Sequence, residues 1–191
     1  MIRKEFRKSL ALPNILLLLC VSILLRGTAF GLSERIKPND FRSPEPVIKK
    51  YYPECRPLQL KDLDRDLQDY FVANYPNLNP GYLSSDFNGD NILDYTFLLV
   101  CEQASKTVIR FIVLMGEKDS AYDLIEIQQW SEQPFLKNLY LHIVRPGNIK
   151  EWDSSRTVSL KFPCIELVLF ESASRVYYWG DGKFKYIQTS D

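Results

Sequence analysis

The sequence predicts an α+β domain in which one N-terminal amphipathic helix packs on an antiparallel, mostly meander β-sheet. Leucine and aromatic residues recur at helical spacing between residues 60 and 74. From residue 95 onward, short runs rich in β-branched and aromatic residues follow one another through brief polar connections. A parallel crossover needs about a dozen residues, so connections this short favour antiparallel neighbours.

The composition is that of one ordinary globular domain. The chain has 191 residues, 24 basic and 24 acidic side chains, and 46% hydrophobic residues. This balance excludes a disordered acidic or basic chain, a collagen-like chain and a coiled coil. The length allows one domain and a tail.

Residues 1–29 have the pattern of a secretory signal peptide. An apolar run over 15–25 precedes the small residues Gly27, Thr28 and Ala29. The basic start consists of Arg3, Lys4, Arg7 and Lys8. The apolar run is shorter than the ~20 residues that span a bilayer as a helix. We therefore expect cleavage after Ala29 and a secreted or periplasmic protein; the alternative is a protein anchored in the membrane by this segment.

Cleavage would make the mature chain weakly acidic. The removed segment carries five basic residues and one acid, which leaves 19 basic and 23 acidic residues. A domain of this net charge is poorly suited to nucleic acid or to an anionic membrane surface. We expect no nucleic-acid partner, and membrane association only if the N-terminal segment is retained.

Residues 30–57 are predicted to be a Pro-rich extended arm, followed by a single α+β domain over 58–191. Five prolines between residues 38 and 57 are expected to prevent a regular helix or a central strand there. The helix is expected over 60–74, where Pro76 ends the pattern. Strands are expected at 95–100, 107–115, 122–129, 139–144, 157–160, 165–170, 175–179 and 183–188. Gly180-Asp181-Gly182 indicates a tight hairpin between the last two strands.

Three cysteines, Cys55, Cys101 and Cys164, would remain after cleavage. An oxidising compartment favours one disulfide and one free thiol. All three pairings are open, and Cys101–Cys164 is favoured because both residues adjoin strand-like runs. The alternative is three buried free thiols. Without a CxxC spacing, neither a zinc site nor a redox pair is indicated.

The segment from Asp86 to Asp94 has the spacing of a calcium loop. Calcium takes ~6–8 oxygen ligands from carboxylates, amides, carbonyls and water. Oxygen-bearing side chains stand at its first, third, fifth and ninth positions, and the residue at position seven would offer its carbonyl. The candidate metal ligands are Asp86, Asn88, Asp90, Ile92 and Asp94. Gly89 permits tight curvature, and Asn91 tolerates a left-handed backbone.

This stretch resembles the Asp-rich calcium loop of FG-GAP and VCBS repeat proteins, in which a DxNGDGxxD-like sequence leads into a strand. Over nine positions it also resembles EF-hand and dockerin loops. Phe97 stands at the twelfth position, where an EF-hand has an acid. The single copy supports a loop, not a propeller. More broadly, the chain looks like small exported bacterial proteins of unassigned function, which imply no activity. The alternative interpretation is an Asx-rich turn without metal.

No catalytic residue and no organic cofactor is predicted. The only histidine, His142, is expected to be a polar, outward-facing strand residue, and no GxSxG or P-loop motif is present. The final hairpin is rich in aromatic residues that could bind a protein or carbohydrate partner, or that pair across the strands: Tyr177, Tyr178, Trp179, Phe184 and Tyr186.

These observations favour an exported, non-enzymatic binding or structural module with a Ca²⁺-stabilised loop. One alternative is a metal-dependent hydrolase of the cell envelope that uses Asp86, Asp90 or Asp94. The other is a membrane-anchored envelope subunit with an uncleaved N-terminal segment.

Overall fold

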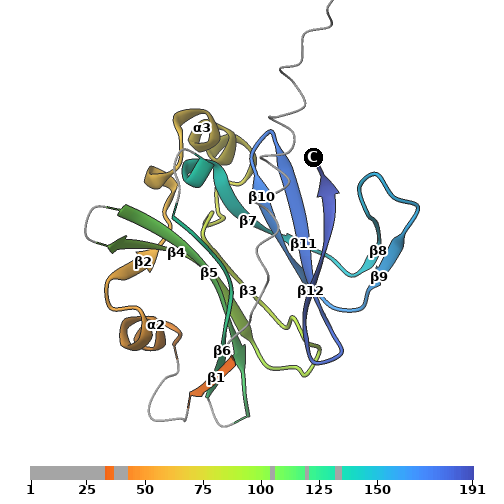
Figure 1. Ribbon diagram of the computed structural model, residues 1–191, viewed down its shortest axis with the longest axis horizontal. Coiled ribbons are helices and arrows are strands. Elements are labelled where there is room, and N and C mark those ends of the chain that lie inside the picture. Colours follow the sequence, from red (N-terminus) through yellow and green to blue (C-terminus); the bar gives the residue numbers. More distant parts are fainter. Residues whose placement is uncertain (1–32, 37–42, 104–105, 119–120, 132–134) are drawn as a thin grey trace, which may run out of the picture.

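The computed structural model describes residues 33–36, 43–103, 106–118, 121–131 and 135–191. This described part of the chain is mostly antiparallel β-sheet, with 52% of its residues in strands and 16% in helices. Two larger sheets lie against each other, and a separate hairpin lies beside the second one (Figure 1). The predicted signal peptide lies outside the described residues. No helix in the described part of the chain is long and apolar enough to cross a membrane.

The first sheet has six strands in the order β1-β6-β5-β4-β2, with β3 also paired to β4. Consecutive strands β4, β5 and β6 form the predicted meander. The strands are β1 (Ser33–Ile36), β2 (Cys55–Pro57), β3 (Tyr82–Ser85), β4 (Asp94–Gln103), β5 (Lys106–Gly116) and β6 (Tyr122–Trp130). Three of them, β1, β2 and β3, were not predicted.

The second sheet has four strands in the order β12-β11-β10-β7. They are β7 (Leu139–Val144), β10 (Cys164–Leu169), β11 (Ala173–Gly180) and β12 (Lys183–Ser190). Between β7 and β10 the chain forms the hairpin β8 (Gly147–Lys150) and β9 (Thr157–Leu160). Asp181 and Gly182 make the β11–β12 turn with φ of 53° and 73°, as the predicted hairpin requires.

The predicted arrangement of layers, one sheet covered by a helix on one face, is wrong. The first sheet is apolar on both faces, and both faces are covered. In β4, Leu98 faces the second sheet and helix α3 (Arg65–Asn74), while Leu99 faces helix α2 (Glu45–Tyr51). Neighbouring residues of one strand point to opposite faces, so each face needs its own cover. The second sheet covers one face, and α2 contributes Val47 and Ile48 to the other.

One helix boundary and one whole helix differ from expectation. The helix predicted over 60–74 begins at Arg65, because Leu63 and Asp64 have extended backbones with ψ of 159° and 154° after the 3-10 turn η1 (Leu60–Asp62). The expectation that prolines exclude helix from residues 30–57 is wrong. Pro44 and Pro46 stand at the start of α2, where a missing N–H leaves no helical hydrogen bond unmade.

The disulfide joins Cys55 to Cys101, so the favoured pairing of Cys101 with Cys164 is wrong. Antiparallel pairing of β2 with β4 sets Cys55 directly opposite Cys101, with 4.1 Å between their Cα atoms. Cys164 is a buried free thiol on β10, in the other sheet. No pattern in the sequence indicates β2, the strand that brings the two cysteines together.

We expect Cys55→Ser to lower the free energy of unfolding by about 4 kcal/mol, because the disulfide closes a loop across a separation of 46 residues. Denaturant unfolding under non-reducing conditions measures the loss. Cys164→Ala is the control and should lose only the packing of one small side chain. Peptide mapping that finds Cys164 in a disulfide would contradict the pairing.

Candidate metal centre

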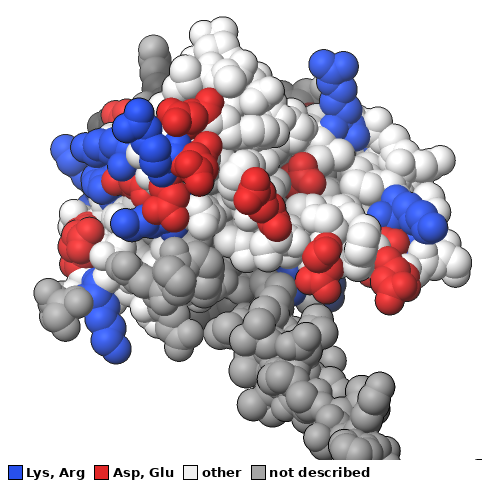
Figure 2. Space-filling model, turned by 90° about the horizontal axis from the view of Figure 1, so that it is seen from above, with Lys and Arg blue, Asp and Glu red and all other residues white. Residues whose placement is uncertain are grey.

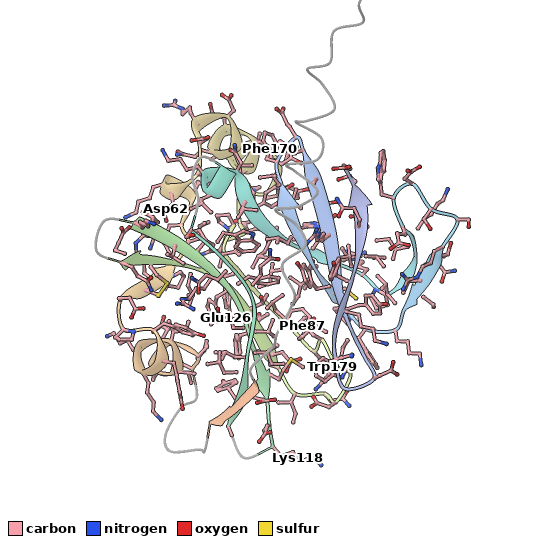
Figure 3. The ribbon with its side chains drawn as sticks, in the orientation of Figure 1. Asp62, Phe87, Lys118, Glu126, Phe170 and Trp179 are labelled. Atoms are coloured by element: carbon pink, nitrogen blue, oxygen red, sulfur yellow. A yellow bond between two sulfur atoms is a disulfide. The ribbon has the colours of Figure 1, made fainter. Side chains whose placement is uncertain are left out.

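The Asp-rich segment connects β3 to β4 at one end of the facing sheets (Figure 1). Phe87, its second residue, is fully buried in the core between the sheets. Trp179 of β11, on the opposite sheet, packs against the same core cluster, and Figure 3 labels both residues. The segment is therefore anchored in the core at its start, although Asn91 and Asp90 are exposed.

Asp86 organises the turn through its carboxylate. Its Oδ1 accepts hydrogen bonds from the backbone N–H groups of Gly89 at 2.6 Å and Asp90 at 3.1 Å. Its Oδ2 accepts one from Asn91 at 2.9 Å. This tight course requires positive φ at Gly89 (79°) and Asn91 (64°), which confirms the curvature predicted at both positions.

Asn88 and Asp90 continue the same pattern. The Asn88 Oδ1 accepts from the Asp90 N–H at 3.0 Å, and the Asp90 Oδ1 accepts from the Ile92 N–H at 2.8 Å. The Asn88 Nδ2 donates to the Asp90 Oδ2 at 2.9 Å. Three predicted ligands, Asp86, Asn88 and Asp90, thus belong to one hydrogen-bonded turn.

Asp94 differs from the other three because it is completely buried. Its Oδ1 accepts from the Gly116 N–H and its Oδ2 from the Phe87 N–H, each at 2.8 Å. The pKa of Asp94 is raised to about 6, chiefly by burial and to a smaller extent by the nearby charges of Asp90 and Asp86, while the two hydrogen bonds act in the opposite direction. The buried carboxylate therefore stands within electrostatic reach of both other acids.

Two residues that hold the loop were not predicted. A Cβ on Gly116 would lie 2.6 Å from both the Ile92 Cγ2 and the Leu93 oxygen, so only glycine lets β5 approach the loop this closely. A Cβ on Gly89 would lie 2.0 Å from the Phe162 Cε1, in the connection between β9 and β10. A glycine closing an apolar run was the only available signal for Gly116, and the sequence offered none for Phe162.

The turn contains oxygen atoms that could act as metal ligands, but it has no dense cluster of acidic side chains. Among the described residues, no three His, Cys, Asp or Glu side chains form a group that could hold a metal ion by themselves. A metal here would also need the Asn88 amide oxygen and main-chain carbonyls such as that of Ile92. Within the described ranges, Asp86, Asp90 and Asp94 form no salt bridge with a basic side chain.

His142 and the aromatic hairpin lie elsewhere. His142 is half-buried on β7, with its Nδ1 3.3 Å from the Glu166 Oε2 on β10. Its surroundings are therefore those of a cross-strand polar pair. In the hairpin, Tyr177 is buried opposite Tyr186, which is 43% exposed. Trp179 stands opposite Phe184 with 5.2 Å between ring centroids, so these four residues form cross-strand pairs.

Comparisons of the chain with protein-family models, with curated proteins and with solved structures find no match.

We expect Gly116→Ala to destabilise the protein by about 1–3 kcal/mol, because its methyl group would overlap the loop backbone. Thermal or denaturant unfolding measures the loss. Gly180→Ala is the matched control, since its Cβ would meet only Lys185 at 3.7 Å and should change stability by about 0.5 kcal/mol or less. Equal losses from both variants would refute the close packing at Gly116.

In the presence of a chelator, we expect Asp94 to make the protein more stable at low pH. A carboxyl whose pKa rises from 3.8 to about 6 on folding favours the fold while protonated. This contribution is complete below pH 3.8, is lost as the pH rises through 6, and amounts to about 3 kcal/mol.

Unfolding of wild type and Asp94→Asn between pH 4 and 8 isolates this titration, because an amide does not ionise in that range. The difference in unfolding free energy between the two proteins should fall as the pH rises. A pH-independent difference would show that Asp94 has an ordinary pKa.

Proposed function

We propose that the protein is an exported, non-enzymatic structural or binding module of the cell envelope or the secreted fraction. Its Asp-rich loop binds Ca²⁺, and the ion stabilises the end of the molecule where the two sheets meet. One observation carries the proposal: the charges of Asp86 and Asp90 act on the buried carboxylate of Asp94, and no described basic side chain pairs with any of the three.

A divalent cation would change the sign of the electrostatic energy in this loop. Neighbouring carboxylates repel one another, and burial adds a solvation cost at Asp94. A bound cation is the largest charge in such a site and attracts every carboxylate around it. The ligands would be the side chains of Asp86, Asn88, Asp90 and Asp94 and the Ile92 carbonyl. Extracellular calcium modules work at affinities of about 10⁻⁴–10⁻³ M, which suits an exported protein.

The hydrolase alternative has less support from the geometry. A catalytic metal keeps an open position beside a substrate pocket. One cavity, with a volume of about 290 Å³, is lined by Lys61, Asp62, Glu102 and Lys137 among others and by no residue of the loop. A smaller one, about 40 Å³, lies at Trp130 and Arg175. Figure 2 shows basic and acidic side chains intermixed at one side of the upper face, so neither positive nor negative charge predominates there.

A partner could meet the aromatic hairpin at Tyr186, the most exposed of its residues. The Arg175 guanidinium lies over this ring at 4.8 Å from its centroid. A half-exposed aromatic ring beside a charged donor suits a carbohydrate or a polar protein surface. Binding of such a partner at Tyr186 is the secondary part of the proposal.

We expect 5 mM CaCl₂ to raise the melting temperature of residues 30–191 by about 3–6 °C relative to EGTA. For a dissociation constant of about 0.5 mM, the linkage relation gives about 1.4 kcal/mol. In a domain of this size each kcal/mol shifts the melting temperature by about 2–4 °C. Residues 30–191 contain every described contact of the fold.

Asp90→Asn should abolish the shift, because it removes a ligand charge while keeping an oxygen for the Ile92 N–H. Asp153→Asn is the matched control: this exposed residue removes the same charge from the β8–β9 turn, at a φ of 49° that asparagine tolerates. It should keep the full shift. Wild-type protein with the same melting temperature in calcium and EGTA would leave the loop as an Asx-rich turn.

A further inference from the structure

Positive charge is concentrated in one part of the molecule, which we call the basic lobe: residues 145–161, with the β8–β9 hairpin, and residues 181–185, at the β11–β12 turn. Its basic residues are Arg145, Lys150, Arg156, Lys161, Lys183 and Lys185. Three acids accompany them, Glu151, Asp153 and Asp181, so the lobe has a formal charge of +3. The other residues between 30 and 191 include 13 basic and 20 acidic side chains, a formal charge of −7.

The two parts of the lobe are held together as one surface. Ile149 and Val158 of the hairpin pack against a small core that includes Val176 and Ile187 of the second sheet. The Trp152 N–H also donates to the Gln188 oxygen on β12 at 2.8 Å. The hairpin therefore lies against the second sheet, as Figure 1 shows, and its charges keep their position relative to those of β12.

The basic side chains are close enough to influence one another. Lys185, Lys183 and Lys161 all lower the pKa of Asp181, chiefly through the hydrogen bond from Lys185. Arg156 acts on Lys185 from the hairpin side and opposes its charge.

Most of the charge of the lobe is available to a partner. The Lys185–Asp181 and Arg156–Glu151 ion pairs neutralise two of its bases. The remaining four bases make no salt bridge within the described ranges and are exposed: Arg145, Lys150, Lys161 and Lys183.

An exposed tryptophan stands at the tip of the same hairpin. Trp152 is 51% exposed, and it follows Glu151 in the β8–β9 turn. The Trp152 ring belongs to none of the hydrophobic clusters among the described residues. Tryptophan rings are enriched at the headgroup level of membranes, where one part of the ring is apolar and the N–H stays in contact with water.

We propose that the basic lobe docks on an anionic lipid surface, with its lysine and arginine side chains among the headgroups and Trp152 inserted at their level. A lipid surface fits better than a nucleic acid, because the acids Glu151, Asp153 and Asp181 alternate with the bases in the two segments of the lobe and would repel a fixed row of phosphates. A lipid surface is laterally adaptable and responds to the summed charge, to which each basic residue contributes about fivefold in partitioning. The net negative charge of residues 30–191 does not indicate this local basic surface.

Vesicle co-sedimentation of residues 30–191 in EGTA tests the proposal independently of calcium. We expect binding to vesicles of 70% phosphatidylcholine and 30% phosphatidylglycerol at 50 mM NaCl, several-fold weaker binding at 300 mM, and none to pure phosphatidylcholine. Trp152 emission should shift to the blue on binding, in a signal obtained by subtracting the Trp152→Phe variant.

The double variant Lys161→Gln/Lys183→Gln should weaken partitioning about 25-fold. Lys49→Gln/Lys50→Gln is the matched control, since it removes the same charge from exposed positions on α2, which covers the first sheet. It should bind nearly as well as wild type. The proposal is overturned if anionic vesicles do not bind at low salt, if the two double variants lose binding equally, or if heparin binds while the vesicles do not.

Discussion

The contact on which the candidate site depends is the buried carboxylate of Asp94. It stands at the first residue of β4 and accepts one N–H from the start of the loop, at Phe87, and one from the end of β5, at Gly116. A carboxylate has two acceptor oxygens and no donor, so it can satisfy both N–H groups at once. An asparagine would offer one oxygen and would direct an amide N–H toward a second donor. The acid is thus required by the hydrogen bonds, although its burial is unfavourable.

This requirement connects the loop to the fold around it. Fixing Phe87 by its N–H also fixes its ring in the core between the sheets, and fixing Gly116 brings β5 against Ile92 and Leu93. Phe162 then lies against Gly89 from the β9–β10 connection. The loop consequently touches both sheets, and a change in its conformation would alter how they meet. A calcium ion there would act on the junction as a whole.

Much of the secondary structure was predictable, because it depends on local patterns. All eight predicted strands exist, and the Asp181-Gly182 turn follows from the φ values that its residues tolerate. The layers were not predictable in the same way. The continuous apolar sequence of β4 was compatible with one buried face or two, and only the second sheet and α2 together decide between them. The Cys55–Cys101 pair depends on β2, a three-residue strand that contains a proline and has no periodic pattern of its own.

The candidate site shows the same division between local and distant causes. The spacing of Asp86, Asn88 and Asp90 predicted a curled turn, and positive φ at Gly89 and Asn91 agrees with it. The direction of Asp94 could not be predicted, because it is set by Gly116, 22 residues away along the chain. The basic lobe has a similar origin. Its charges come from two separate hairpins and form one surface only after the second sheet has brought them together, so the net charge of −4 for residues 30–191 obscured a local charge of the opposite sign. The net charge of a chain describes its surface only where the charges are evenly distributed, and in this protein the fold separates basic from acidic regions.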